Sequence, residues 1–253
     1  MNLTLANVST KVAQAEFQAT VDAIAKQVAE HFCPEWNINA SLKSICLPLG
    51  NKKAPIQKDA DAMIYLGDSS EDPTIGVSGA YGYHAANNKK VPYGFVYLDI
   101  CGQANEPWTV TLSHEVLELL GDPDAAMTVT GPAPKGVSGT VYYDLEVCDP
   151  TQGDNYKIEN VLVSNFVGKS YFGLSGGSGK TNYLGLPLRP FGVRPGGYFQ
   201  YEKGGRGHQV WGRDVTPAQK KAKEKMKHVR RNARRLKNLA ARPKRKTKSR
   251  SKE

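Results

Sequence analysis

The sequence contains no apolar run of the roughly 18 residues that a membrane-spanning helix needs. Its N-terminus, MNLTLANVSTK, lacks the basic segment followed by an apolar one that marks a secretory signal. Cysteines are few, and none of the four forms a CxxC pair. Each stands beside apolar residues, so we expect buried free thiols in a reducing compartment, which favours a cytoplasmic location and no membrane contact. The four are Cys33, Cys46, Cys101 and Cys148.

Acidic residues are nearly absent from the C-terminal segment. Residues 216–253 hold 17 Lys or Arg against 2 Asp or Glu, whereas the rest of the chain holds 17 against 22. The net charge of +10 therefore comes entirely from this segment. Such an asymmetry predicts that residues 216–253 bind nucleic acid or another polyanion. No aromatic residue interleaves the basic ones, so stacking on bases is not indicated.

The composition outside this segment is that of an ordinary globular protein, and the segment itself divides into two parts. Between residues 217 and 240, apolar residues recur at alternating spacings of four and three, which predicts a basic helix with a narrow apolar stripe. From residue 241 onward, ARPKRKTKSRSKE has almost no apolar content and is predicted to be disordered. We therefore expect a globular domain over residues 8–212 and a basic helical and disordered tail over 213–253.

Two helices are predicted in the globular part. Apolar residues three or four apart indicate a helix from about residue 10 to 32, capped by Ser9 or Thr10 and ended by Pro34. A second helix is expected over residues 107–120, because a proline at the first turn and a glycine just past the end are typical helix boundaries.

Short apolar runs between and after these helices predict strands, and together they indicate an α+β fold, a small mixed sheet with the second helix packed beneath it. Pro92 suggests that the strand preceding this helix lies at a sheet edge. Residues 67–90 are predicted to be mostly loop, and residues 173–212 show little regular pattern. The expected strands are 41–47, 62–66, 91–100, 141–147 and 161–167.

The strongest chemical signal is the segment SHEVLE, residues 113–118, inside the second predicted helix. His114 and Glu118 are four residues apart and therefore share a helix face. Imidazole nitrogens and carboxylate oxygens are both normal zinc ligands. Glu115 points elsewhere, within reach of a metal-bound water for which it is a candidate general base. The alternative is a hydrogen-bonded core histidine with both glutamates on a solvated face.

The segment resembles the HExxH helix of the zincin metallopeptidases, with Glu118 in place of the second histidine. This resemblance implies a zinc-dependent hydrolase that acts on a peptide or protein, with an extended substrate along the strand before the helix. A carboxylate ligand weakens the ion as a Lewis acid, so other divalent metals are candidates too. The combination of SHEVLE, GDP and LEVCDP also resembles a set of bacterial and phage proteins of metallopeptidase character, over roughly residues 10–175.

Two places in the sequence offer a third metal ligand. Glu146 or Asp149, in an acidic block after the helix, would correspond to the distant acidic ligand of some zincins. Asp124 ends the segment HEVLELLGDPD, whose spacing is that of the metzincins, with a glycine turn before the third ligand. We favour Glu146 slightly over Asp124. The reason is that Pro123, just before Asp124, is also explained as the residue that ends the helix, with Asp122 as a local cap.

Other motifs carry less weight. LSGGSGKT, residues 174–181, lacks the glycine that a phosphate-binding P-loop needs five residues before Gly179. His84 and His208 lie in predicted loops without a ligand-spaced partner. Both are interpreted as incidental, and the alternative is that they line the cleft or bind substrate. A phenol that stabilises an oxyanion is a further possibility that nothing in the sequence assigns to one residue. The candidates are Tyr142, Tyr143 and Tyr171.

Two functional hypotheses follow. The leading one is a metallopeptidase-like hydrolase in which Glu115 is the general base and His114, Glu118 and Glu146 hold Zn²⁺ or another divalent metal. The alternative is a non-catalytic phage or prophage protein, associated with the virion, on a degenerate zincin scaffold. In that case the basic tail supplies the function by binding nucleic acid.

Overall fold

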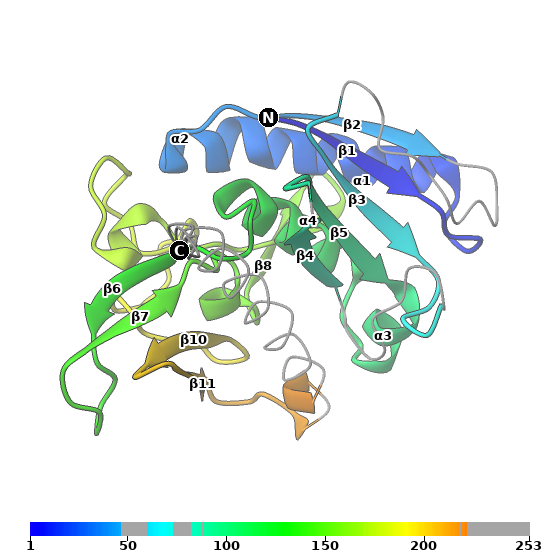
Figure 1. The fold of residues 1–253 in the computed structure, drawn as a ribbon. Coiled ribbons are helices and arrows are strands. Elements are labelled where there is room, and N and C mark those ends of the chain that lie inside the picture. Colours follow the sequence, from blue (N-terminus) through cyan, green and yellow to red (C-terminus); the bar gives the residue numbers. More distant parts are fainter. Residues whose placement is uncertain (47–59, 73–81, 88, 218, 222–253) are drawn as a thin grey trace, which may run out of the picture.

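The chain folds as a mixed α+β protein, as the sequence predicts (Figure 1). The described strands form sheets of five, four and two strands. In the part of the chain that is described, no helix is long and apolar enough to cross a membrane. The basic helix and disordered end predicted after residue 217 fall almost wholly outside that part. The computed structural model describes residues 1–46, 60–72, 82–87, 89–217 and 219–221.

The largest sheet is mixed and has the strand order β2-β1-β3-β5-β4. Four of its strands run parallel to one another, and β4 runs antiparallel to β5. This confirms the expected small mixed sheet. Its strands are β1 (Asn2–Asn7), β2 (Ser41–Cys46), β3 (Ala62–Gly67), β4 (Gly82–Ala86) and β5 (Pro92–Tyr97).

Two of these strands differ from the prediction. β1 lies before the expected domain start at residue 8, yet it pairs with both β2 and β3, and its Leu3 and Leu5 are fully buried. β4 lies inside the stretch predicted to be mostly loop. Its sequence, GYHAA, has almost no β-branched or bulky apolar residues, so pairing with β5 rather than local preference makes it a strand.

The edge of the sheet also differs from the prediction. β5 lies between β3 and β4, so the interpretation of Pro92 as an edge marker was wrong. Pro92 is the first residue of β5, where a missing N–H costs little. The strand then stops at Tyr97 instead of residue 100, because α3 (Leu98–Gln103) begins there. Strand β4 takes the edge position, which brings it beside the second predicted helix.

The first helix is confirmed but is longer than predicted. It runs as α1 (Gln14–Lys26), a π-helical segment η1 (Gln27–Phe32) and α2 (Cys33–Trp36). Pro34 does not end it but sits in the first turn of α2, directly after the π-helical segment η1. Ser9 and Thr10 do not cap the helix either, because both hydroxyls donate to the Asp68 carboxylate.

The second helix, α4 (Trp108–Gly121), is confirmed and packs against the same sheet face as α1. Alternate residues of β1, β3 and β5 point toward the two helices and form one hydrophobic core with them. Fully buried members of this core include Leu3, Leu5, Ile64 and Val96 from the sheet and Phe17, Ile24, Leu112 and Val116 from the helices.

The second half of the chain adds a four-stranded antiparallel sheet and a hairpin. In Figure 1 the four-stranded sheet lies below and to the left of the first, with α4 near the middle of the molecule. The strands predicted at 141–147 and 161–167 are present but end at residues 144 and 164. β10 and β11 come from a region that showed little pattern. The sheet contains β6 (Thr128–Pro132), β7 (Thr140–Asp144), β10 (Tyr198–Lys203) and β11 (Arg206–Trp211), and the hairpin contains β8 (Asn155–Ile158) and β9 (Val161–Ser164).

Candidate metal centre

Helix α4 buries the three residues of the HExxE motif. His114, Glu115 and Glu118 are 2%, 3% and 3% exposed, respectively. The alternative in which both glutamates lie on a solvated face is therefore wrong. A buried carboxylate without a compensating charge or hydrogen bond is costly, so these side chains need partners inside the protein.

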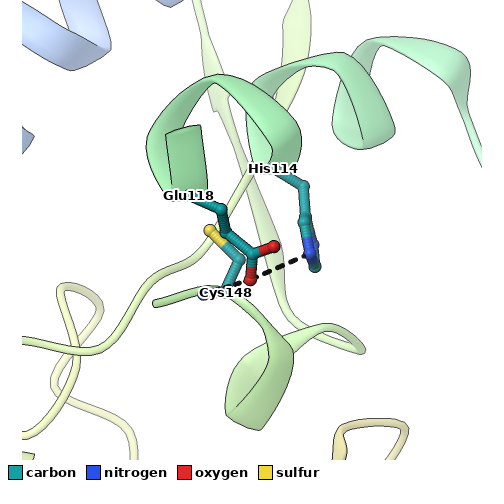
Figure 2. Close-up of side chains that lie close together, drawn as sticks. All are labelled: His114, Glu118 and Cys148. Atoms are coloured by element: carbon teal, nitrogen blue, oxygen red, sulfur yellow. Dashed lines mark hydrogen bonds and ion pairs between the residues drawn. The ribbon is translucent and has the colours of Figure 1, made fainter. Parts of the chain in front are cut away.

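The two predicted ligands of the helix, one imidazole and one carboxylate, lie close to a further acidic residue. Nε2 of His114 lies 3.2 Å from Oε1 of Glu118 and 3.3 Å from Oδ1 of Asp149. Figure 2 shows His114 and Glu118 leaving α4 on the same side, with Cys148 beside Glu118. The backbone N–H of Cys148 donates to Glu118 Oε1 over 3.3 Å, which orients that carboxylate. Helix α4 and the start of η2 (Asp149–Thr151), with Cys148 just before it, thus converge on one point.

These side chains line a cavity of about 20 Å³, room for one ion or one water molecule. Helix α4 forms one wall, edge strand β4 a second, β10 a third and the 146–149 segment the fourth. No lysine or arginine is among the described residues that line it. The lining residues are Gly82, Tyr83, His84, His114, Glu115, Glu118, Glu146, Asp149, Tyr198 and Gln200.

The three candidates for the third ligand are placed differently. Asp149 contacts His114, as described above. Glu146 also lines the cavity, and its carboxylate lies within 4.8 Å of ligand atoms of Glu118 and His84. Asp124 lies in the turn after α4 and is not among the residues that line the cavity. The acidic block therefore supplies the convergent acids: Asp149 contacts His114, and the favoured Glu146 lies with Glu118 and His84.

Two neutral side chains complete the surroundings of the acidic groups. Tyr198, from β10, is hydrogen-bonded to Asp149, and burial raises the pKa of its phenol well above the usual value, with Asp149 and Glu118 adding to the effect. The Tyr198 phenol therefore stays protonated and donates its hydrogen to the Asp149 carboxylate. Burial, followed by the charge of Glu118, likewise raises the pKa of the Cys148 thiol.

Glu115 is held between strand β4 and an imidazole. Its Oε2 lies 3.5 Å from Nδ1 of His84. A Cβ placed on Gly82 would lie 2.9 Å from both Cγ and Oε1 of Glu115, closer than real Cβ contacts. Glycine at this position therefore lets the Glu115 side chain lie directly against the backbone of the edge strand.

A buried hydrogen-bond network fixes the rotation of α4. The Ser113 hydroxyl donates to Oε1 of Gln27 over 2.8 Å and accepts from the backbone N–H of Ser164 over 2.9 Å. Nε2 of Gln27 in turn donates to the Ser164 carbonyl over 2.8 Å. Ser113 directly precedes His114, so the network sets the face of the helix that points into the cavity.

Sequence reasoning missed His84, Tyr198 and Gln200. His84 was interpreted as a loop residue, although its spacing of two from Gly82 places both on the same side of β4. Tyr198 and Gln200 lie in a strand that was not predicted. The tyrosines considered as oxyanion donors lie elsewhere: Tyr142 is exposed, and the hydroxyls of Tyr143 and Tyr171 donate to the carbonyls of Pro132 and Gly192.

The remaining sequence signals have structural roles. In the glycine-rich loop, the backbone N–H of Ser178 donates to Oε2 of Glu35 over 2.8 Å, and the N–H of Lys169 donates to Oε1 over 3.0 Å. The loop and the segment before it thus both donate to the Glu35 carboxylate. His208 is exposed on β11 and stacks on Tyr201.

The chain matches no family model, no curated protein and no solved structure in the comparisons with known proteins. The arrangement that carries the argument is a small buried cavity in which an imidazole contacts two carboxylates and a third carboxylate, Glu115, forms part of the wall.

Proposed function

We propose that this chain is a metal-dependent hydrolase of the metallopeptidase type, in which His114, Glu118 and Asp149 hold Zn²⁺ or another divalent cation. The observation that carries the proposal is the pair of 3.2 Å and 3.3 Å distances from His114 Nε2 to the two carboxylates. Ligand atoms about 2.0–2.2 Å from a tetrahedral zinc ion are roughly 3.3–3.6 Å apart, which is close to the two distances from His114 Nε2. One imidazole and two carboxylates are an ordinary donor set for zinc.

When bound, the metal would supply Lewis acidity, which polarises a carbonyl and lowers the pKa of water. The chain's own residues do the rest. Glu115, in the cavity wall but outside the ligand set, accepts the proton of the attacking water and passes it to the leaving amine. Tyr198 donates its phenol hydrogen to Asp149, which keeps that carboxylate oriented.

The edge strand beside the cavity favours an extended substrate. Within the described residues, β4 pairs only with β5, and its other side carries no strand. A peptide in extended conformation gains main-chain hydrogen bonds when it adds to such an edge. Gly82 and His84 of β4 line the cavity, so a peptide along this strand would pass directly over Glu115.

Metal content tests the proposal directly. Untagged protein purified without chelator is expected to retain at least one equivalent of zinc or another divalent ion per chain, measured by inductively coupled plasma mass spectrometry. The His114→Ala variant is expected to lose it, because the imidazole contacts both carboxylate ligands. Asp124→Ala is the matched control and should keep the metal, since Asp124 lies outside the cavity. Wild-type protein that remains metal-free after incubation with zinc would contradict the proposal.

The contact between Gly82 and Glu115 gives a second prediction. Gly82→Ala places a methyl group against Glu115, so kcat for hydrolysis of a fluorogenic peptide should fall by up to about 10²-fold as the base is displaced. The metal content should not change, because no ligand is touched. Gly102→Ala is the control, because a Cβ there meets nothing within 4 Å. An unchanged kcat in Gly82→Ala would argue against Glu115 as the base.

A further inference from the structure

A second and larger cavity lies outside the candidate metal centre. It measures about 350 Å³, within the roughly 300–1,000 Å³ of typical small-molecule sites, and it shares no lining residue with the acidic cavity. Its walls come from η1, the first turn of α2 and the segment 166–183, which contains the glycine-rich loop. The lining residues that bear on its ligand are His31, Glu35, Phe166, Lys180 and Tyr183.

One wall of this cavity is aromatic and is held in place by its neighbours. The ring of Tyr183 stacks on His31, with centroids 4.4 Å apart, and on Phe166 at 5.2 Å. Nδ1 of His31 lies 2.9 Å from the Tyr156 hydroxyl, which also accepts from Nε2 of Gln27 over 3.1 Å. Burial lowers the pKa of the His31 imidazole, so this ring adds no positive charge near neutral pH. The wall therefore offers uncharged ring surface against which another aromatic ring can pack.

His31 also belongs to a rare type of helix. The segment η1 is π-helical over six residues, Gln27–Phe32, between α1 and α2. π-Helical turns are uncommon in proteins and are frequently found at functional sites. Here the turn places Gln27 in the buried network beside Ser164 and His31 in the cavity wall. The cavity thus has a feature besides its volume that is typical of a functional site.

Two opposite charges line the same cavity. Glu35 is 9% exposed, and its carboxylate oxygens accept from the backbone N–H groups of Lys169 and Ser178. Lys180 is exposed on the glycine-rich loop. Within the described ranges, no ion pair joins Glu35 and Lys180 to each other or to another charged side chain. A carboxylate oxygen accepts more than one hydrogen bond, so Glu35 can take a further donor from a ligand.

The glycine-rich loop fixes the position of the Glu35 carboxylate. A Cβ on Gly168 or Gly177 would overlap Oε1 of Glu35, so the absence of a side chain at both positions lets the backbone approach this closely. The loop is thus built around one carboxylate and leaves it at the surface of the cavity. A carboxylate held in this way is suited to an ammonium group, because charge-assisted hydrogen bonds are strong where little water reaches them.

We propose that this cavity binds a free aromatic amino acid as a zwitterion. The ammonium group would bind Glu35, and the carboxylate would bind Lys180. The ring would pack against the wall of His31, Tyr183 and Phe166. A volume near the lower end of the usual range suits a ligand of this size. The inference does not depend on the proposed function, because no residue of the candidate metal centre lines this cavity.

Isothermal titration calorimetry of the full-length chain tests this inference. The probes are L-phenylalanine, L-tyrosine and L-tryptophan, of which at least one is expected to bind. Two analogues of the tightest binder then separate the charges: the arylethylamine lacks the carboxylate, and the 3-arylpropionate lacks the amine. Each analogue should bind at least about tenfold more weakly than the amino acid, because each loses one charge-assisted hydrogen bond.

Two variants locate the binding site. Glu35→Gln should weaken binding of the amino acid and the arylethylamine at least about tenfold and leave that of the 3-arylpropionate unchanged. Lys180→Met should weaken binding of the amino acid and the 3-arylpropionate and leave that of the arylethylamine unchanged. Lys180 is exposed, so this substitution should not disturb folding. The matched controls are Glu16→Gln and Lys135→Met, which make the same changes at other exposed positions and should bind as the wild type does.

Three results would overturn the inference. The first is a wild-type chain that binds none of the three amino acids at millimolar concentration. The second is equal affinity for the amino acid and its two analogues, which would show that the cavity does not recognise the charges. The third is binding that Lys180→Met leaves unchanged, since the amino acid would then lie elsewhere. The analogues and Lys180→Met decide the matter even where Glu35→Gln does not fold.

Discussion

Glu115→Gln is expected to lower kcat for peptide hydrolysis by about 10²–10⁴-fold, the usual contribution of a general base. The amide keeps the size and hydrogen-bonding reach of the side chain but cannot accept a proton from water. The metal content should stay at the wild-type value, because Glu115 is not a ligand in the proposed centre. Initial rates with fluorogenic casein or a peptide library, at saturating substrate, give the comparison.

The matched control is Glu30→Gln, which makes the same chemical change on an exposed residue of η1. It should leave kcat within experimental error of the wild type. If Glu115→Gln hydrolyses peptides as fast as Glu30→Gln does, Glu115 is not the base and the catalytic part of the proposal fails. A loss of metal in Glu115→Gln would instead place Glu115 among the ligands.

Phe32→Ala is expected to cause the largest loss of stability, about 3–5 kcal/mol in the free energy of unfolding. The Phe32 ring is fully buried and packs edge-on against Phe166, with ring centroids 5.2 Å apart, and against Trp36 at 5.9 Å. It also lies at the end of α4, since a Cβ on Gly121 would come within 3.8 Å of it. Truncation therefore leaves a cavity where three segments meet.

Thermal unfolding followed by circular dichroism measures this loss. For a chain of this size, about 2–4 °C of Tm corresponds to each kcal/mol, so a fall of about 6–20 °C is expected. Lys26→Ala, an exposed change at the end of α1, should alter the free energy of unfolding by no more than about 0.5 kcal/mol. A Phe32→Ala protein as stable as this control would show that the ring does not hold η1 and α4 together.

The helix that carries the site could be predicted because its signals are local. All of them lie within the 15 positions from Pro107 to Gly121. They are the proline before the first turn, a run of apolar residues and the four-residue spacing of His114 and Glu118. The same holds for the buried strands β3 and β5. These elements have strong intrinsic preferences that agree with their final environment, so tertiary structure does not override them.

The rest of the site depends on contacts distant in sequence. β4 forms because it pairs with β5, and β10 because it pairs with β7 and β11, so His84 and Tyr198 could not be assigned from local pattern. The choice between Glu146 and Asp149 depends on the path of the chain after β7. Bonds between distant segments hold that path, among them one of 2.7 Å from the Val167 N–H to the Val147 carbonyl.

The Ser113–Gln27–Ser164 network has a consequence for how the cavity acquires a cation. Each hydroxyl, amide and backbone group in it is satisfied by the protein itself, at distances of 2.8–2.9 Å. The helix face that carries His114 is therefore oriented by folding, without an ion. Such preorganisation lowers the reorganisation energy of uptake, so the apoprotein would keep the architecture of the cavity and could be reloaded with different divalent ions without refolding.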